Sequence, residues 1–243
     1  MSWTTPLTAG PARRGLVALI LAVVALTGGA CSKKDDAPAK AATPEEVMKL
    51  AQGKLDDTSG LALSLTTQDL PEGVTGLVSA KGTGTNAPAF DGTITVVIAG
   101  TDVPVPVIAV DGKVFAKIPL TVGWSDVDPS EYGAPDPAAL MTPGTGFSSL
   151  LPATTDLTKG DSERGGADNN EILTVYTGKV PGEAMKKVIP SSSGDSFDVA
   201  YKITDKGELR EAKLTGVFYP KTDAMTYTVT FEDYGTTKEI SAP

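Results

Sequence analysis

After residue 43 the apolar residues of this chain follow two periods, and the first is helical. In the segment TPEEVMKLAQGKL, one helix face would carry Val47, Leu50, Ala51 and Leu55. Thr43 and Glu46 have the spacing of a capping box, and Pro44 suits the first helical position. This pattern predicts a helix that begins at Pro44.

The period then changes to two, which predicts β-strands. Alternating apolar residues fill the runs LALSLTT, TITVVIAG, VPVPVIAV, SFDVAYKIT, ELREAKLTGVFY and AMTYTVTFEDY. Asp91-Gly92, Asp111-Gly112 and the segment AGTD have hairpin-turn chemistry, and KGTGTN is interpreted as a further turn. Pro104 and Pro106 cannot donate ladder hydrogen bonds, so their strand is expected to be an edge or to contain a bulge.

The centre of the chain is different, with loops and short helices expected at 137–141 and 147–151. Strand patterns resume near Leu157 and in EILTVYTGKV, and PGEAMKKVIP predicts one late helix. Long antiparallel strands with a few separate helices indicate an α+β fold. No internal repeat is visible, so residues 44–243 are expected to form a single domain.

Strand alternation and the helix faces select the side chains that should point into the fold. These candidates are Leu63, Leu65, Ile94, Val96, Ile98, Val107, Phe115, Met185 and Val188. A register slip of one residue would turn a whole strand over. The same residues could line a cavity or fill an ordinary core, and the pattern alone leaves both open.

The N-terminal residues 1–30 have the organisation of a secretory signal. Arg13 and Arg14 precede an apolar run at 16–26, and small residues follow it. The run is shorter than a typical membrane span, although an N-terminal anchor helix is the alternative. The last small residues and Cys31, in the segment GGAC, resemble the lipobox of bacterial lipoproteins, in which the cysteine is diacylated and becomes the N-terminus. Gly28 stands where a lipobox usually has leucine, so cleavage after Ala30 without lipidation is the other possibility.

Residues 31–43 are rich in Ala, Pro and Lys and are expected to form a flexible tether. A coil of this length spans about 20 Å on average and about 40 Å when stretched. A lipidated Cys31 would then hold the domain at the extracytoplasmic face of the cell membrane while letting it pivot.

The composition excludes several kinds of chemistry. The chain has no histidine and only one cysteine, which removes the usual zinc sites and His-based triads. Its net charge of −9 argues against nucleic-acid binding. The segment DVDPSEYG, at 126–133, lacks the glycine and the final carboxylate of a calcium loop, and an Asx turn is the simpler interpretation. No cofactor, metal site or catalytic constellation is expected.

Four segments in this order and spacing resemble the LppX/LprA/LprF/LprG family of mycobacterial and related actinobacterial lipoproteins, most of all its LprG branch. They are VFAKI, GWSDVDPSEYGAPDPAALMTPGTGFSSLL, YTGKVPGEAMKKVIP and TYTVTFEDYG. The resemblance implies a half-barrel sheet that wraps around helices and encloses a hydrophobic cavity for acyl chains. It also implies a triacylated glycolipid or triacylglycerol as ligand, and a major-facilitator transporter as partner.

Three classes of function therefore compete. The first is a membrane-anchored lipoprotein that binds acylated lipids and moves them from the cell membrane toward the outer envelope. The second is a structural or adaptor lipoprotein with a packed interior that docks on a transporter. The third, a surface hydrolase, has no recognisable active-site motif in its favour.

Overall fold

The computed structural model describes residues 42–132, 134–166 and 168–243. The expected signal segment, Cys31 and all but the last two residues of the tether lie outside these ranges. The described residues form one compact unit. No helix among the described residues has the length and apolarity needed to cross a membrane.

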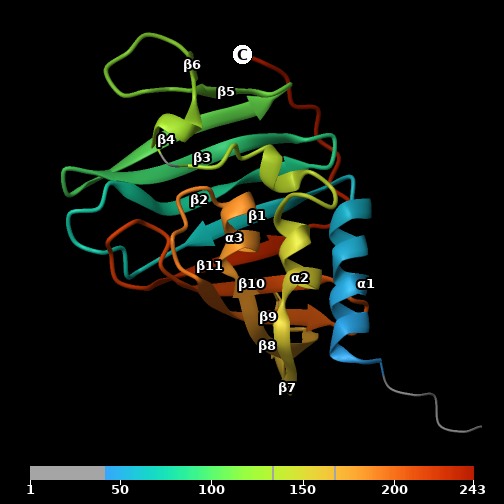
Figure 1. Cartoon of the computed structure of the whole chain (residues 1–243). Helices are drawn as coiled ribbons and strands as arrows, with labels where there is room; N and C mark the ends of the chain where they lie inside the picture. Colours follow the sequence, from blue (N-terminus) through green and yellow to red (C-terminus); the bar gives the residue numbers. More distant parts are fainter. Residues whose placement is uncertain (1–41, 133, 167) are drawn as a thin grey trace, which may run out of the picture. The chain divides into compact units, whose positions relative to one another are not determined.

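The unit is built on one curved, unclosed antiparallel sheet of eleven strands (Figure 1). Its order is β6-β5-β4-β3-β2-β1-β11-β10-β9-β8-β7, so that only the β1–β11 contact joins strands distant in sequence. The strands are β1 (Gly60–Thr66), β2 (Gly76–Thr85), β3 (Ala89–Ile98), β4 (Thr101–Val110), β5 (Lys113–Ala116), β6 (Ser125–Val127), β7 (Thr155–Gly165), β8 (Glu171–Pro181), β9 (Ser196–Thr204), β10 (Leu209–Gly216) and β11 (Met225–Glu232). This is the α+β half-barrel that the sequence and the resemblance implied.

The three α-helices lie on one face of this sheet, in front of β8 to β11 (Figure 1). They are α1 (Pro44–Asp57), α2 (Leu150–Ala153) and α3 (Gly182–Val188), with three short 3-10 segments, η1 (Pro129–Tyr132), η2 (Ala139–Met141) and η3 (Phe147–Ser149). Asp56, near the end of α1, accepts hydrogen bonds from the Ser148 hydroxyl at 2.6 Å and from the Gly144 amide at 3.0 Å. These bonds hold the central segment against α1.

Helix α1 begins where its capping signals predict. The Thr43 hydroxyl accepts a bond from the Glu46 amide, and the Glu46 carboxylate accepts one from the Thr43 amide. The buried face differs from the expected one, because it is centred on Met48, Ala51 and Leu55. Leu50 is 48% exposed and lies over Gly207, so its place in the expected apolar face was wrong.

Two of the expected turns are confirmed and two are wrong. Ala99-Gly100 and Asp111-Gly112 all have positive φ, as the tight β3–β4 and β4–β5 turns require. Asp91-Gly92 lies inside β3, and residues 81–85 of KGTGTN lie inside β2, a strand that the alternation pattern did not reveal. Glycine weakens strand patterns because it adds no side chain to either face.

The two prolines of β4 occupy a local edge, as expected. Pro104 and Pro106 pair with β3 on one side. On the other side β5 pairs only with residues 107–110, apart from one bond from the Lys117 amide to the Pro106 carbonyl. The missing proline N–H groups therefore leave no gap in the ladder.

Candidate functional site

The register of the sheet defines which side chains share the face that carries the helices. One row of neighbouring residues crosses the sheet from β11 to β5. In order it contains Phe231, Leu63, Gly82, Gly92, Val107 and Ala116, each paired with the next. A parallel row runs through Val229, Leu65, Ala80, Ile94 and Val105. We call this side of the sheet the inner face.

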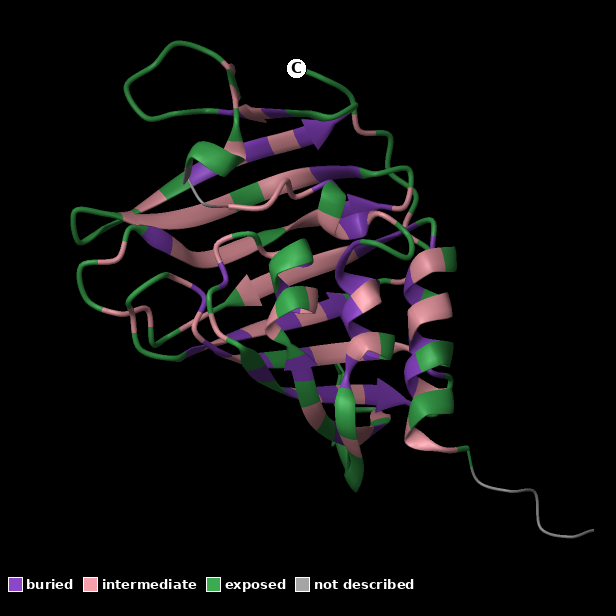
Figure 2. Cartoon of the chain, in the orientation of Figure 1, coloured by how far each residue is buried: buried purple, intermediate pink, exposed green. Residues whose placement is uncertain are grey.

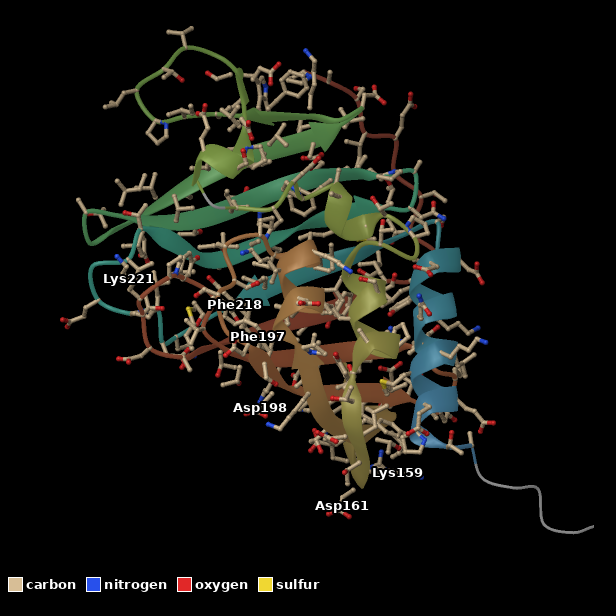
Figure 3. The ribbon with its side chains drawn as sticks, viewed as in Figure 1. Lys159, Asp161, Phe197, Asp198, Phe218 and Lys221 are labelled. Atoms are coloured by element: carbon tan, nitrogen blue, oxygen red, sulfur yellow. The ribbon has the colours of Figure 1, made fainter. Side chains whose placement is uncertain are left out.

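Over β8 to β11 the inner face is completely packed. Its inward residues are buried together with the helix residues Met185 and Val188 in a single apolar cluster. The centres of the Phe197 and Phe218 rings lie 4.9 Å apart (Figure 3). Phe218 also contacts the Tyr227 ring edge-on at the same distance. We call this region the packed half.

Over β1 to β4 the same face is covered less completely. We call its partly buried residues the open half, namely Leu63, Leu65, Ile94, Val96 and Val103. Figure 2 shows the contrast between this part of the sheet, largely intermediate in burial, and the buried stripes of β9 to β11. Leu63 contacts the buried clusters of both halves, so the apolar inner face is continuous.

Glycines thin the inner surface within the open half. A Cβ at Gly82 would lie 2.6 Å from Cζ of Phe90, and one at Gly92 would lie equally close to that atom. The Phe90 ring can therefore lie flat on two strands, where it is buried. A Cβ at Gly84 would meet the Met141 side chain at 2.7 Å, so this glycine admits η2 in the same way.

The sequence-predicted site residues are not all brought together. The inner face carries five of them, namely Leu63, Leu65, Ile94, Val96 and Val107. Val107, on β4, is buried. Ile98 is 50% exposed at the end of β3. Met185 and Val188 lie in the packed half. Cys31 lies outside the described residues.

Phe115 is on the opposite, outer face, because it pairs with Ile108 rather than with Val107 or Ala109. The two-residue turn at Asp111-Gly112 determines this pairing. Turn geometry and strand alternation together would have placed Phe115 outward from the sequence alone.

A polar cluster lies where β2 meets the β10–β11 connection. The Tyr227 hydroxyl donates to the Leu77 carbonyl at 2.7 Å, and the Leu77 amide donates to the Tyr219 hydroxyl at 3.1 Å. The two hydroxyls are 2.9 Å apart, and burial is the main cause that raises the pKa of Tyr227. These bonds satisfy the backbone at the irregular step between Leu77 and Ser79.

Ion pairs gather on strands β7 to β10, and Lys202 and Glu211 lie on the outer face, opposite the packed inner face of the same strands. Arg210 makes a two-point contact with Glu171, and this hydrogen bonding lowers the pKa of Glu171. Lys202 lies 2.8 Å from Glu163 and lowers the pKa of that carboxyl by hydrogen bonding.

In the segment DVDPSEYG, Asp128 accepts a hydrogen bond from the Ser130 amide, which is the Asx turn anticipated there. Among the residues that the structure describes, no three His, Cys, Asp or Glu side chains could share a metal ion.

Two surface recesses lie apart from the open half. One recess, of about 640 Å³, lies between the β2–β3 connection and the β4–β5 turn at Asp111-Gly112. The C-terminal segment 238–242 forms part of its wall. The other, of about 450 Å³, lies on the outer face between Lys179 and Lys213. Neither recess is lined by the incompletely covered apolar side chains of the open half.

Comparison with known proteins gives a match at the level of family and fold. The model of the LppX_LprAFG lipoprotein family matches residues 43–241. LprF from Mycobacterium bovis has 13% identity and a TM-score of 0.66, covering 82% of this chain and 96% of that one. LppX from Mycobacterium tuberculosis has 14% identity and a TM-score of 0.59, covering 82% of this chain and 98% of that one. No curated protein gives a significant match.

Proposed function

Since this chain belongs to the LppX_LprAFG lipoprotein family, we propose that it is a membrane-anchored carrier whose inner sheet face binds the acyl chains of a lipid. The open half is the proposed binding surface, with Leu63, Leu65, Ile94 and Val96 as its central contacts. Membership in a lipoprotein family implies attachment to the membrane of the cell envelope. The proposed activity is binding and transfer, without catalysis.

The observation that carries the proposal is the difference between the two halves of one continuous apolar face. In the packed half, helix and strand side chains fill the interior, whereas the open half lacks an equivalent cover. An aliphatic chain is the simplest cover, because it adds apolar contacts without requiring hydrogen-bond partners. Ala80, which stands between Leu65 and Ile94, adds only a methyl group to this part of the face.

The energetics explain why a carrier is needed. Exposing a 16-carbon acyl chain to water costs about 12 kcal/mol at about 0.8 kcal/mol per methylene, so unaided transfer between membranes is slow. A protein surface that replaces the water lowers this barrier. Because the donor bilayer is equally apolar, the net affinity stays modest and the lipid can be released.

The finer assignment follows the LprG-like features of the sequence. We expect the ligand to be a triacylated glycolipid or triacylglycerol, carried from the cell membrane toward the outer envelope. A major-facilitator transporter is the expected partner. We further propose that Cys31 is diacylated and that the domain is held at the extracytoplasmic face through the tether of residues 31–43.

Mass spectrometry of the full chain, extracted from membranes with a mild detergent, tests both proposals. Under native conditions the protein should retain a mass equal to one acylated lipid, which denaturation removes. The denatured chain should begin at Cys31 and carry a covalent diacylglycerol. An adaptor with a packed interior would retain no lipid, and an unmodified Cys31 would contradict the anchor.

A further inference from the structure

The connection between β5 and β6 carries an unusual group of exposed apolar side chains. It consists of Lys117 to Trp124, with the sequence KIPLTVGW, and we call it the β5–β6 loop. Leu120 and Val122 are as exposed as in an extended peptide, at 107% and 102%, and Ile118 is 37% exposed. Figure 2 shows much of this loop exposed, standing away from the sheet.

This grouping is not the usual scatter of surface apolar residues. Six large apolar residues among the described ones are exposed, and three of them lie in this loop, the others being Leu50, Ile98 and Ile172. A contiguous apolar patch marks an interaction surface more often than isolated residues do. The β5–β6 loop is thus the strongest candidate contact surface on the described part of the chain.

One turn of the loop is hydrogen-bonded internally, while its apolar side chains are exposed. The Ile118 carbonyl accepts bonds from the Thr121 amide at 3.2 Å and from the Thr121 hydroxyl at 2.8 Å. The Lys117 ammonium lies 4.9 Å from the centre of the Trp124 ring. A contact made by the tip would therefore bury mainly hydrocarbon, with lysine and tryptophan at its base.

Charge distinguishes the loop from the rest of the molecule. Its eight residues contain one cation and no anion, in a chain whose net charge is −9. An anionic membrane surface repels an acidic body, but it tolerates a segment of this composition. Apolar tips flanked by Trp and Lys match the gradient from hydrocarbon to headgroups at a bilayer interface.

Topology places the loop near the route that a lipid would take. β5 runs toward the end of the sheet that carries Ile98 and the β3–β4 turn, and the loop leaves the sheet beside Pro106, part-way along β4. Helix α3 follows β8 at this end as well. Val103, on the β4 side of the open half, lies three residues from Pro106, where the loop leaves the sheet.

We propose that the β5–β6 loop inserts Leu120 and Val122 into the interface of the lipid bilayer that anchors the protein. Insertion would turn the adjacent end of the open half toward the membrane, so that an acyl chain could pass along the inner face without crossing water. This inference rests on the proposed carrier function. The proposed partner of the loop is the bilayer itself and not a protein surface.

Tryptophan quenching tests the proposal on the full chain. Trp3 lies in the expected signal segment, which a mature chain that begins at Cys31 no longer carries, so Trp124 is the only tryptophan reporter of the mature protein. The purified protein is reconstituted into vesicles of phosphatidylcholine with some phosphatidylglycerol, in which part of the phosphatidylcholine carries bromine on its acyl chains near the headgroup. The brominated vesicles should quench Trp124, and Leu120→Asp with Val122→Asp should reduce quenching to that of unbrominated vesicles.

Ile172→Asp is the matched control, because Ile172 is 49% exposed at the opposite end of β8 and should leave quenching unchanged. The double variant should keep its thermal midpoint, since both side chains are surrounded by solvent. Absent quenching, or quenching that the double variant retains, overturns the proposal. A photo-crosslinker at Leu120 that captures only protein in native membranes overturns it in favour of a protein surface. Native mass spectra of the double variant test the carrier function separately. If the double variant still retains lipid, the carrier function holds even where the membrane contact of the loop fails.

Discussion

At the scale of single residues, the glycines of β2 and β3 determine the shape of the inner face. Gly82 and Gly92 stand opposite each other, and the Phe90 ring occupies the space that their side chains would take. The role of both glycines was missed from the sequence because KGTGTN and Asp91-Gly92 have the composition of turns. Their spacing held the missing signal, since Gly82 and Gly84 are two residues apart and thus on one face of a strand.

Gly82→Val should destabilise the fold by about 1–3 kcal/mol, because the new side chain collides with Phe90 and with the Asp91 carbonyl. Thr83→Val is the control, since Thr83 points to the other face of the same strand and valine is a good strand residue. Urea unfolding followed by circular dichroism measures the difference. Equal midpoints for the two variants would mean that the Phe90 ring moves aside at no cost.

At the scale of elements, the sequence predicted those with strong periodicity and missed those without it. The alternation of Met225, Tyr227, Val229 and Phe231 with threonines is seen directly in β11. The capping box of α1 and the late helix α3 were predicted for the same reason, since each has local chemistry that determines its start or its buried face. Strand β2 carries three glycines and few large apolar residues, and its pairing with both neighbours overrides that weak local signal.

The two halves of the sheet should respond differently to an added large side chain. Ile94→Trp or Val96→Trp, in the open half, should leave stability near that of the wild type and reduce bound lipid, because the indole takes space meant for an acyl chain. Leu214→Trp, in the packed half, should destabilise by about 1–3 kcal/mol or more. Thermal unfolding and native mass spectra of the same variants give both readouts. Equal destabilisation in both halves would indicate a filled core throughout.

At the scale of the whole molecule, the sequence predicted the architecture better than the site. The order of strands and helices, together with the family resemblance, implied the half-barrel that the structure has. The distribution of cover over the inner face could not be read from strand patterns, because alternation tells which side chains point inward but not what lies above them. Met185 and Val188 show this limit, since both point inward and both are covered by core residues.

The most direct test of the central claim is a map of where an acyl chain touches the protein. A lipid with a photoactivatable diazirine in its acyl chain is loaded onto the full chain in membranes, irradiated, and the labelled peptides are sequenced. We predict labels on β1 and β3, around Leu63, Leu65, Ile94 and Val96, and their loss in Ile94→Trp. Labels confined to the outer face or to the recess at the C-terminal segment, or none on the described strands, would contradict the carrier account.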